Sequence, residues 1–292
     1  MERPTDAEPE GRLEGAYEPR PHFPTTTTLY SSMDDRDLFD TATRLVGEDN
    51  AGELDRVLGV VSSRELRIDS WRVSGKPDCT ILTLAILLDH LGSLTVLLDH
   101  GFGTDKRVKL RGNHRGAALP LHLCCANGRE APLGQLLKYK GVNIDGKDEK
   151  GNTPLHVCAQ HDEAKCMYIL LNAGAKPSPF NRMGHSPLHT AAKYNAAAVA
   201  AALVKVSAAN ITNSNGESPL HLACAWNAMA VARLLCQYGG DQLAVDANGE
   251  SPLHKCCRHG HRDIVEYLCT KGALKRAMEA TVVPARKAHG KT

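Results

Sequence analysis

One six-residue pattern recurs from residue 119 onward at a nearly fixed interval: glycine, any residue, threonine or serine, proline, leucine and histidine. Full copies begin at Gly151, Gly184, Gly216 and Gly249, and a looser copy without the glycine occupies 119–122. The prolines of the five copies are 34, 33, 32 and 33 residues apart. A chain with such a period builds its fold from stacked copies of one unit, because each unit buries its apolar face only against its neighbours.

The pattern combines the residues of a tight turn with those of a helix start. Each glycine follows an aspartate or asparagine by three residues; Asx side chains close turns, and glycine tolerates positive φ. Threonine or serine then serves as the helix N-cap, and proline takes the first helical position, where a missing N–H costs nothing. Leucine begins the buried face. The predicted structural residues are Thr153, Pro154, His156, Ser186, Pro187, His189, Ser218, Pro219, His221, Ser251, Pro252 and His254.

A period near 33 that carries Thr/Ser-Pro-Leu-His resembles the ankyrin repeat. The resemblance covers about residues 36–274 and is most regular from 119 onward. It implies an all-α solenoid of about 6–7 stacked helix-turn-helix units with short β-hairpin or turn fingers. It also implies that the motif histidines bond to the neighbouring turn.

The composition along the chain divides it into four parts. A proline-rich, acidic stretch over 1–33 predicts a disordered tail, which either serves as a docking segment or is an uncommitted leader. Residues 34–118 read as degenerate N-terminal capping repeats with a basic insertion at 102–118, and 275–292 as a basic tail. The regular repeats are expected at about 119–150, 151–183, 184–215, 216–248 and 249–274.

The insertion has two interpretations. It concentrates positive charge against the single acid Asp105, and such a finger suits phosphate, an acidic partner or an import receptor. The alternative is a solvated hairpin whose charges keep it soluble. The basic residues are Lys106, Arg107, Lys109, Arg111 and Arg115.

The ten cysteines argue against a disulfide framework. Most fall in repeated helix positions that elsewhere hold small residues such as Ala191 and Ala192, so we expect them to be buried and reduced in the cytoplasm and/or nucleus. The longest apolar runs, 79–88 and 196–204, are about half of a membrane span. A net charge of +2 gives no overall field that favours nucleic acid or membrane.

No constellation in the sequence predicts catalysis. The motif histidines of successive repeats should lie on the order of 10 Å apart, because helices pack 8–10 Å apart, whereas zinc needs ligands within about 2.3 Å of one ion. The dense segment 256–261 fits the repeat template better than a metal site. We therefore expect no enzyme activity, no cofactor and no metal.

The positions that the fold leaves free predict the binding surface. One slot near the end of each first helix reads Asn127, His161, Tyr194, Trp226 and His259, and aromatic residues there are favoured binding anchors. The alternative is that Tyr194 and Trp226 lie flat between helices and only cover the interface. The predicted partner-binding residues are His161, Tyr194, Trp226, His259, Lys193, Arg258, Arg182, Met183, His185, Asn215 and Glu217.

These features favour a non-catalytic adaptor or scaffold, a monomer whose concave ankyrin face binds a partner protein or peptide. The alternative function is a nuclear regulatory or nucleic-acid-associated factor that uses the basic finger at 106–115. Fold alone does not decide between them.

Overall fold

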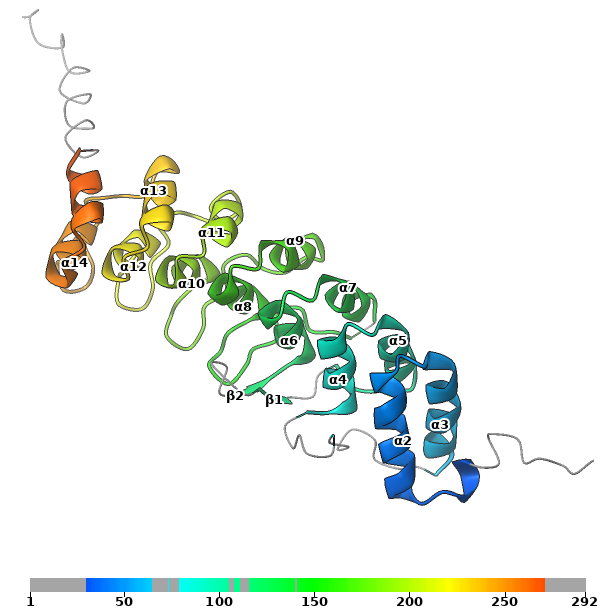
Figure 1. The fold of residues 1–292 in the computed structure, drawn as a ribbon. Helices are drawn as coiled ribbons and strands as arrows, with labels where there is room; N and C mark the ends of the chain where they lie inside the picture. Colours follow the sequence, from blue (N-terminus) through cyan, green and yellow to red (C-terminus); the bar gives the residue numbers. More distant parts are fainter. Residues whose placement is uncertain are drawn as a thin grey trace, which may run out of the picture.

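The computed structural model describes residues 30–64, 73, 79–104, 108–110, 116–139 and 141–270. Their helices form two layers that run from one end of the molecule to the other (Figure 1). The inner layer contains α2 (Asp35–Gly47), α4 (Ile81–Leu88), α6 (Pro120–Ala126), α8 (Pro154–His161), α10 (Pro187–Tyr194), α12 (Pro219–Ala225) and α14 (Pro252–His259). The outer layer contains α3 (Ala51–Ser63), α5 (Leu91–Asp99), α7 (Glu130–Lys138), α9 (Ala164–Asn172), α11 (Ala197–Leu203), α13 (Met229–Gln237) and a helical segment at 262–270.

Each helix packs on its counterpart in the next repeat as well as on its own partner. Contacts join α8 to α10 and α10 to α12 in the inner layer, and α9 to α11 and α11 to α13 in the outer layer. Buried leucines of both layers, such as Leu155, Leu188 and Leu220, meet in one continuous core. Seven helix pairs are present in the described part of the chain, so the predicted helical solenoid of about 6–7 units is confirmed.

A histidine ladder ties successive repeats together. The backbone N–H of Ser186 donates to Nδ1 of His189 (3.2 Å), and Nε2 of that ring lies 2.9 Å from the carbonyl oxygen of Glu217 in the next finger. Because Nδ1 accepts, Nε2 must carry the proton and donate. The same arrangement links Thr153 and His156 to the next finger.

The fingers between repeats are closed by their Asx residues. In one finger, Asn181 accepts through Oδ1 from the backbone N–H groups of Met183 (2.9 Å) and His185 (3.0 Å). Gly184 follows at φ +71°, and an added Cβ there would lie 2.7 Å from the backbone nitrogen of Ser214. Only glycine therefore fits this turn against the next finger.

Position 207 lacks the glycine that ends equivalent outer helices. Gly174 and Gly239 end theirs at positive φ, whereas Ser207 donates from both its hydroxyl (2.7 Å) and its backbone N–H (2.8 Å) to the carbonyl of Leu203. The hydroxyl of Ser207 therefore caps the end of α11, where a glycine at positive φ ends the equivalent helices.

The expected tail over 1–33 needs a correction at its C-terminal end. Residues 30–32 are helical, and Tyr30 is buried and donates a hydrogen bond to Oε2 of Glu53 (2.9 Å). The aromatic side chain has an apolar surface on α3 to cover, which the composition of the tail did not reveal. The rest of the predicted tail, residues 1–29, lies outside the described residues, as does the basic tail at 275–292.

The insertion contains an antiparallel pair of strands, β1 (Val108–Leu110) and β2 (Gly116–Ala118), with Lys109 opposite Ala117. The basic positions 106, 107, 111 and 115 lie outside the described residues, and of Lys109 only the backbone is described.

The prediction that the cysteines are buried is correct for most of the array but wrong at its C-terminal end. Cys125 and Cys224 are buried, whereas Cys257, at the same repeat position, is exposed. The reason is that the next inner helix covers this position in earlier repeats, and no inner helix follows α14 in the described part of the chain. Cys269 is exposed and Cys236 is intermediate.

Candidate functional site

A row of side chains lies along the ends of the inner helices, at the eighth position after each N-cap. We call it the palm row. Tyr194 ends α10 and is 49% exposed, and Trp226, the C-cap of α12, is 56% exposed. The two aromatic rings therefore do not simply lie flat between neighbouring helices and cover the contact between them. The palm row consists of Leu88, Asn127, His161, Tyr194, Trp226 and His259, of which Leu88 is a member that the sequence analysis missed.

Lys193 places a positive charge beside the two exposed rings. Its Nζ lies 4.8 Å from the ring centroid of Trp226 and 5.7 Å from that of Tyr194. Both distances are within the range of a cation–π contact. The centre of the palm row is therefore both aromatic and cationic.

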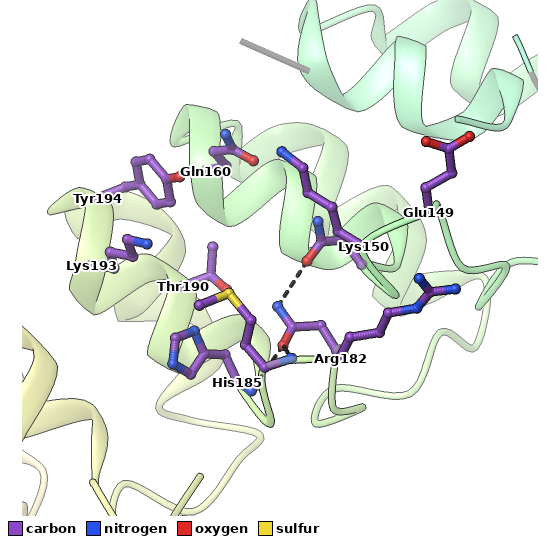
Figure 2. Close-up of a pocket in the computed structure, with 11 residues that line it drawn as sticks. Glu149, Lys150, Gln160, Arg182, His185, Thr190, Lys193 and Tyr194 are labelled. Atoms are coloured by element: carbon purple, nitrogen blue, oxygen red, sulfur yellow. Dashed lines mark hydrogen bonds between the residues drawn. The ribbon is translucent and has the colours of Figure 1, made fainter. Parts of the chain in front are cut away.

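A pocket of about 460 Å³ adjoins this centre (Figure 2). Its walls are the two fingers that follow Asp148 and Asn181, together with the ends of α8 and α10. In Figure 2 Lys150 and Lys193 approach the pocket from different elements, and the guanidinium of Arg182 extends toward Glu149. The lining residues are Glu149, Lys150, Asn152, Gln160, Asn181, Arg182, Met183, His185, Thr190, Lys193 and Tyr194.

Hydrogen bonds between the two fingers fix the walls of the pocket. Nδ2 of Asn181 donates to Oδ1 of Asn152 (2.9 Å), and the backbone N–H of Arg182 donates to the carbonyl of Lys150 (3.1 Å). The backbone that carries Lys150 and Arg182 is thus held in place, while their charged ends remain exposed. Sequence reasoning placed Arg182, Met183, Lys193 and Tyr194 near a binding surface, and the pocket brings these four together.

His185 was predicted to be a free residue of the finger, but it is largely buried. It is 9% exposed, and its ring stacks on that of His189 with centroids 5.9 Å apart. Burial, reinforced by the charge of Lys193, lowers the pKa of His185, so the ring is neutral at pH 7. The side chain forms the floor of the pocket instead of reaching out from its rim.

Glu217, also expected to be free, belongs to a buried ion cluster around Lys255. The Nζ of Lys255 lies 3.0 Å from Glu217, 2.8 Å from Asp246 and 3.2 Å from Glu250. Arg258 forms an ion pair with Glu250, so its charge is offset too. Asn215 also bonds to Glu217, and these interactions leave the finger residues little freedom to bind a partner.

The ion cluster shifts the pKa values of its members. Desolvation by itself would lower the pKa of Lys255, but its hydrogen bonds to Asp246 and Glu217 outweigh burial and raise that pKa. Desolvation likewise opposes ionisation of Glu217, yet the hydrogen bonds from Asn213 and Lys255 hold its pKa below the ordinary value. Lys255 and Glu217 are therefore both charged at neutral pH.

Sequence reasoning missed Lys255, although a signal was present. The residue after each motif histidine is Leu123, Val157, Thr190 and Leu222 in the preceding copies. A lysine at this inward position must find a counter-charge, because an isolated buried ammonium is costly. The acidic finger residues of the same and the preceding repeat supply it.

The remaining predicted palm residues have local partners. The ring of His259 stacks on that of His261 with centroids 5.9 Å apart, and Nε2 of His261 lies 3.1 Å from the carbonyl oxygen of Ala225. His161 is half-buried, and burial lowers its pKa. Both imidazoles therefore extend the palm row as neighbours of the aromatic centre.

Ser62, His100 and Asp55 form a hydrogen-bonded chain that invites comparison with a catalytic triad. Ser62 Oγ lies 3.4 Å from Nδ1 of His100, and Nε2 lies 2.8 Å from Asp55. The Asp55 side chain is 65% exposed, and Ser62 sits in the last turn of α3, where free carbonyl groups, not N–H donors, point outward. This helix end therefore supplies no oxyanion-stabilising donors, and the hydrogen-bonded chain connects α3 with α5.

No cluster of three or more metal-ligating side chains occurs within the described residues. Within the same residues, no helix combines the length and the apolar character that a membrane span needs.

Comparison with known proteins agrees with the repeat geometry. A family model described as ankyrin repeats matches residues 121–211 and 188–278, which together make up more than half of the chain. The chain belongs to the ankyrin-repeat family. The ankyrin histidine ladder, turn glycines and proline-started helices described above lie within the matched region.

Three curated proteins share part of this ankyrin array. Target of rapamycin complex 2 subunit AVO2 of Saccharomyces cerevisiae is 33% identical over 97 residues, 32% of this chain and 21% of that protein. ADP-ribosylation factor GTPase-activating protein AGD2 of Arabidopsis thaliana is 29% identical over 147 residues, 45% of this chain and 18% of that protein. Glycerophosphocholine phosphodiesterase gde1 of Schizosaccharomyces pombe is 33% identical over 99 residues, 34% of this chain and 8% of that protein.

The matched segments span about a fifth or less of each relative. Among solved structures, the ankyrin repeat domain of Bcl-3, a member of the IkappaB protein family, superposes with a TM-score of 0.64 at 21% identity. The match covers 73% of this chain and 92% of that domain. At this identity the similarity shows the fold alone.

Proposed function

We propose that this ankyrin array is a non-catalytic interaction module that holds a partner protein or an extended peptide against its inner-helix face. One observation carries the proposal. Tyr194 and Trp226 are each about half exposed at the same position of two adjacent inner helices, in a chain of only 4% aromatic residues. Large exposed aromatic side chains in a row mark an interaction site, because water contact with them is unfavourable.

The two rings can supply a substantial part of a binding free energy. A buried aromatic side chain covers about 200 Å², so a partner that covers the exposed halves of both rings removes about 200 Å² from water. At about 25 cal/mol per Å² this contributes about 5 kcal/mol. The rest of the palm row adds contact area on both sides.

The names of the relatives support a binding role over a catalytic one. One is a complex subunit, one a GTPase-activating protein and one a phosphodiesterase, and each resembles this chain over a minor part of its length. Because the proteins that share this segment have such different activities, a binding role explains the shared segment better than any one of their reactions does. All ten cysteines are free, which fits a monomer in the reducing cytoplasm and/or nucleus.

A pull-down from extract of the source organism tests the proposal. The bait is the wild-type chain, a Tyr194→Ala/Trp226→Ala variant, or a control variant with Tyr168→Ala/Tyr238→Ala. The control tyrosines are 49% and 47% exposed and belong to α9 and the end of α13 in the outer layer. A comparable, slightly smaller amount of exposed aromatic surface is thus removed from the opposite layer.

We expect partners that bind the wild type and the control but not the palm variant, with all three baits equally helical by circular dichroism. Partners retained by the palm variant would refute the palm site. If those partners were instead lost on neutralising the basic finger at 106–115, the nuclear or nucleic-acid-associated alternative would be favoured.

A further inference from the structure

We propose that the pocket beside the palm row is a subsite for an acidic side chain, and that the partner segment is an extended peptide with an apolar side chain close to this acid. This inference rests on the proposed function and gives the chemistry of its partner. The acid would sit among Lys150, Arg182 and Lys193, and the apolar side chain against Tyr194 and Trp226.

The pocket has an excess of positive charge. Three cations line it against the single acid Glu149, and within the described residues none of the three forms an ion pair. Toward the C-terminal end of the inner face, by contrast, Lys255 and Arg258 pair with carboxylates of the same and the preceding finger. Among the described residues, the pocket is therefore a place on this face where an incoming carboxylate would find unmatched charge.

The charges are held in a preformed frame. Lys150 and Arg182 project from fingers that are bonded to each other through the Asn181–Asn152 side chains and through their backbones. Lys193 projects from α10 and is kept near the pocket by its contacts with two rings. The backbone of the pocket would therefore need little ordering on binding, which favours affinity.

The acidic and apolar subsites adjoin each other. The ammonium of Lys193 is 4.8 Å from the Trp226 ring centroid, while Lys193 and Tyr194 also line the pocket. In an extended peptide, residues two apart point to the same side and are about 7 Å from each other. An acid and an apolar residue separated by one position can thus reach both subsites.

The far side of Trp226 sets the direction of the peptide. There the ion cluster holds three carboxylates, of Glu217, Asp246 and Glu250, against the two cations Lys255 and Arg258. A second acidic side chain placed on that side would face a net negative charge. The acidic end of the segment should therefore lie toward the fingers at 148–152 and 181–185.

Selection from a displayed library of random ten-residue peptides tests the inference. The target is the wild-type chain, with counter-screens against Lys150→Gln/Arg182→Gln/Lys193→Gln, against Tyr194→Ala/Trp226→Ala, and against Lys138→Gln/Lys176→Gln/Lys205→Gln. The control lysines are exposed and belong to α7, the loop after α9 and the segment after α11. Both triple variants lower the net charge by three, so a general electrostatic effect cancels between them.

We expect enriched peptides that contain Asp or Glu two positions from a large apolar residue. They should bind the pocket variant about tenfold more weakly and the control variant unchanged. Neutral or basic peptides that depend on Tyr194 and Trp226 would overturn the acidic subsite and leave the proposed function standing. Peptides indifferent to both surfaces, or no enrichment at all, would overturn both.

Discussion

Lowering the pH from 7 to 5 should destabilise the array through its histidine ladder. At His156, His189 and His221, Nδ1 accepts a hydrogen bond from the N-cap backbone and Nε2 donates to a carbonyl of the next finger. Protonation would place a hydrogen on Nδ1 where a donor already points, inside a fully buried site. Burial accordingly lowers the pKa of His156 and of His189 to about 4.

The sign and the size follow from proton linkage. In the unfolded chain a histidine has a pKa of about 6.5, so between pH 6.5 and 4 the unfolded state binds more protons than the folded state. The stability is fully present above pH 6.5 and is lost as the pH falls toward 4. A pH of 5 lies about 1.5 units below the unfolded pKa. The free energy of unfolding therefore falls by about 2 kcal/mol for each ring, and by about 4 kcal/mol for His156 and His189 together.

Urea unfolding at pH 7 and pH 5 measures this loss, with His189→Gln as the comparison. Glutamine keeps a polar side chain but does not titrate, so the loss of free energy of unfolding between the two pH values should be about 2 kcal/mol smaller in the variant than in the wild type. Comparing differences removes any change in stability that the substitution causes at pH 7. Equal stability of the wild type at both pH values, or an undiminished pH dependence in His189→Gln, would refute the reasoning.

Three further predictions concern stability and thiol reactivity. Lys255→Met should lower the free energy of unfolding by about 3–5 kcal/mol, because the carboxylates around it are left unpaired; a thermal midpoint within about 2 °C of the wild type would contradict this. Gly184→Ala should be less stable than Gly174→Ala by about 1–3 kcal/mol in urea, because both have positive φ but only at Gly184 does the added Cβ meet the next finger. In the folded protein Ellman's reagent should react rapidly with the exposed thiols of Cys257 and Cys269, and rapid reaction of all ten thiols would contradict the burial of the rest.

The fold could be predicted because every local signal in a repeat gives the same answer. The Asx residue closes the turn, the glycine permits it, Ser186 and its equivalents cap the helix, and the proline occupies the first helical position. These signals involve residues within a few positions of one another. Repetition then supplies the long-range contacts, since each repeat packs on a copy of itself.

The state of the finger side chains could not be predicted from the same signals. Whether His185 or Glu217 is free depends on neighbours such as His189 and Lys255, the latter 38 residues from Glu217. The repeat pattern marks both positions as variable, but it does not reveal the effect of Lys255, which stands at a position that is mostly apolar in the preceding repeats. The pocket likewise forms between two fingers about 30 residues apart, and only the stacked geometry brings them together.

The palm row could be predicted in part from the sequence. Its periodicity is visible in the sequence, and the exposure of Tyr194 and Trp226 comes from the structure. What binds there remains a proposal that rests on this exposure and on the charge of Lys193.

The affinity of a captured partner for the purified chain tests the central claim most directly. By calorimetric titration, Tyr194→Ala/Trp226→Ala should weaken binding by at least about 30-fold, since two interface aromatics commonly contribute about 2 kcal/mol or more. Tyr168→Ala/Tyr238→Ala should leave the dissociation constant within about twofold of the wild type. Equal affinity of all three proteins, or a loss caused by the outer-layer variant alone, would contradict a binding site on the inner-helix face.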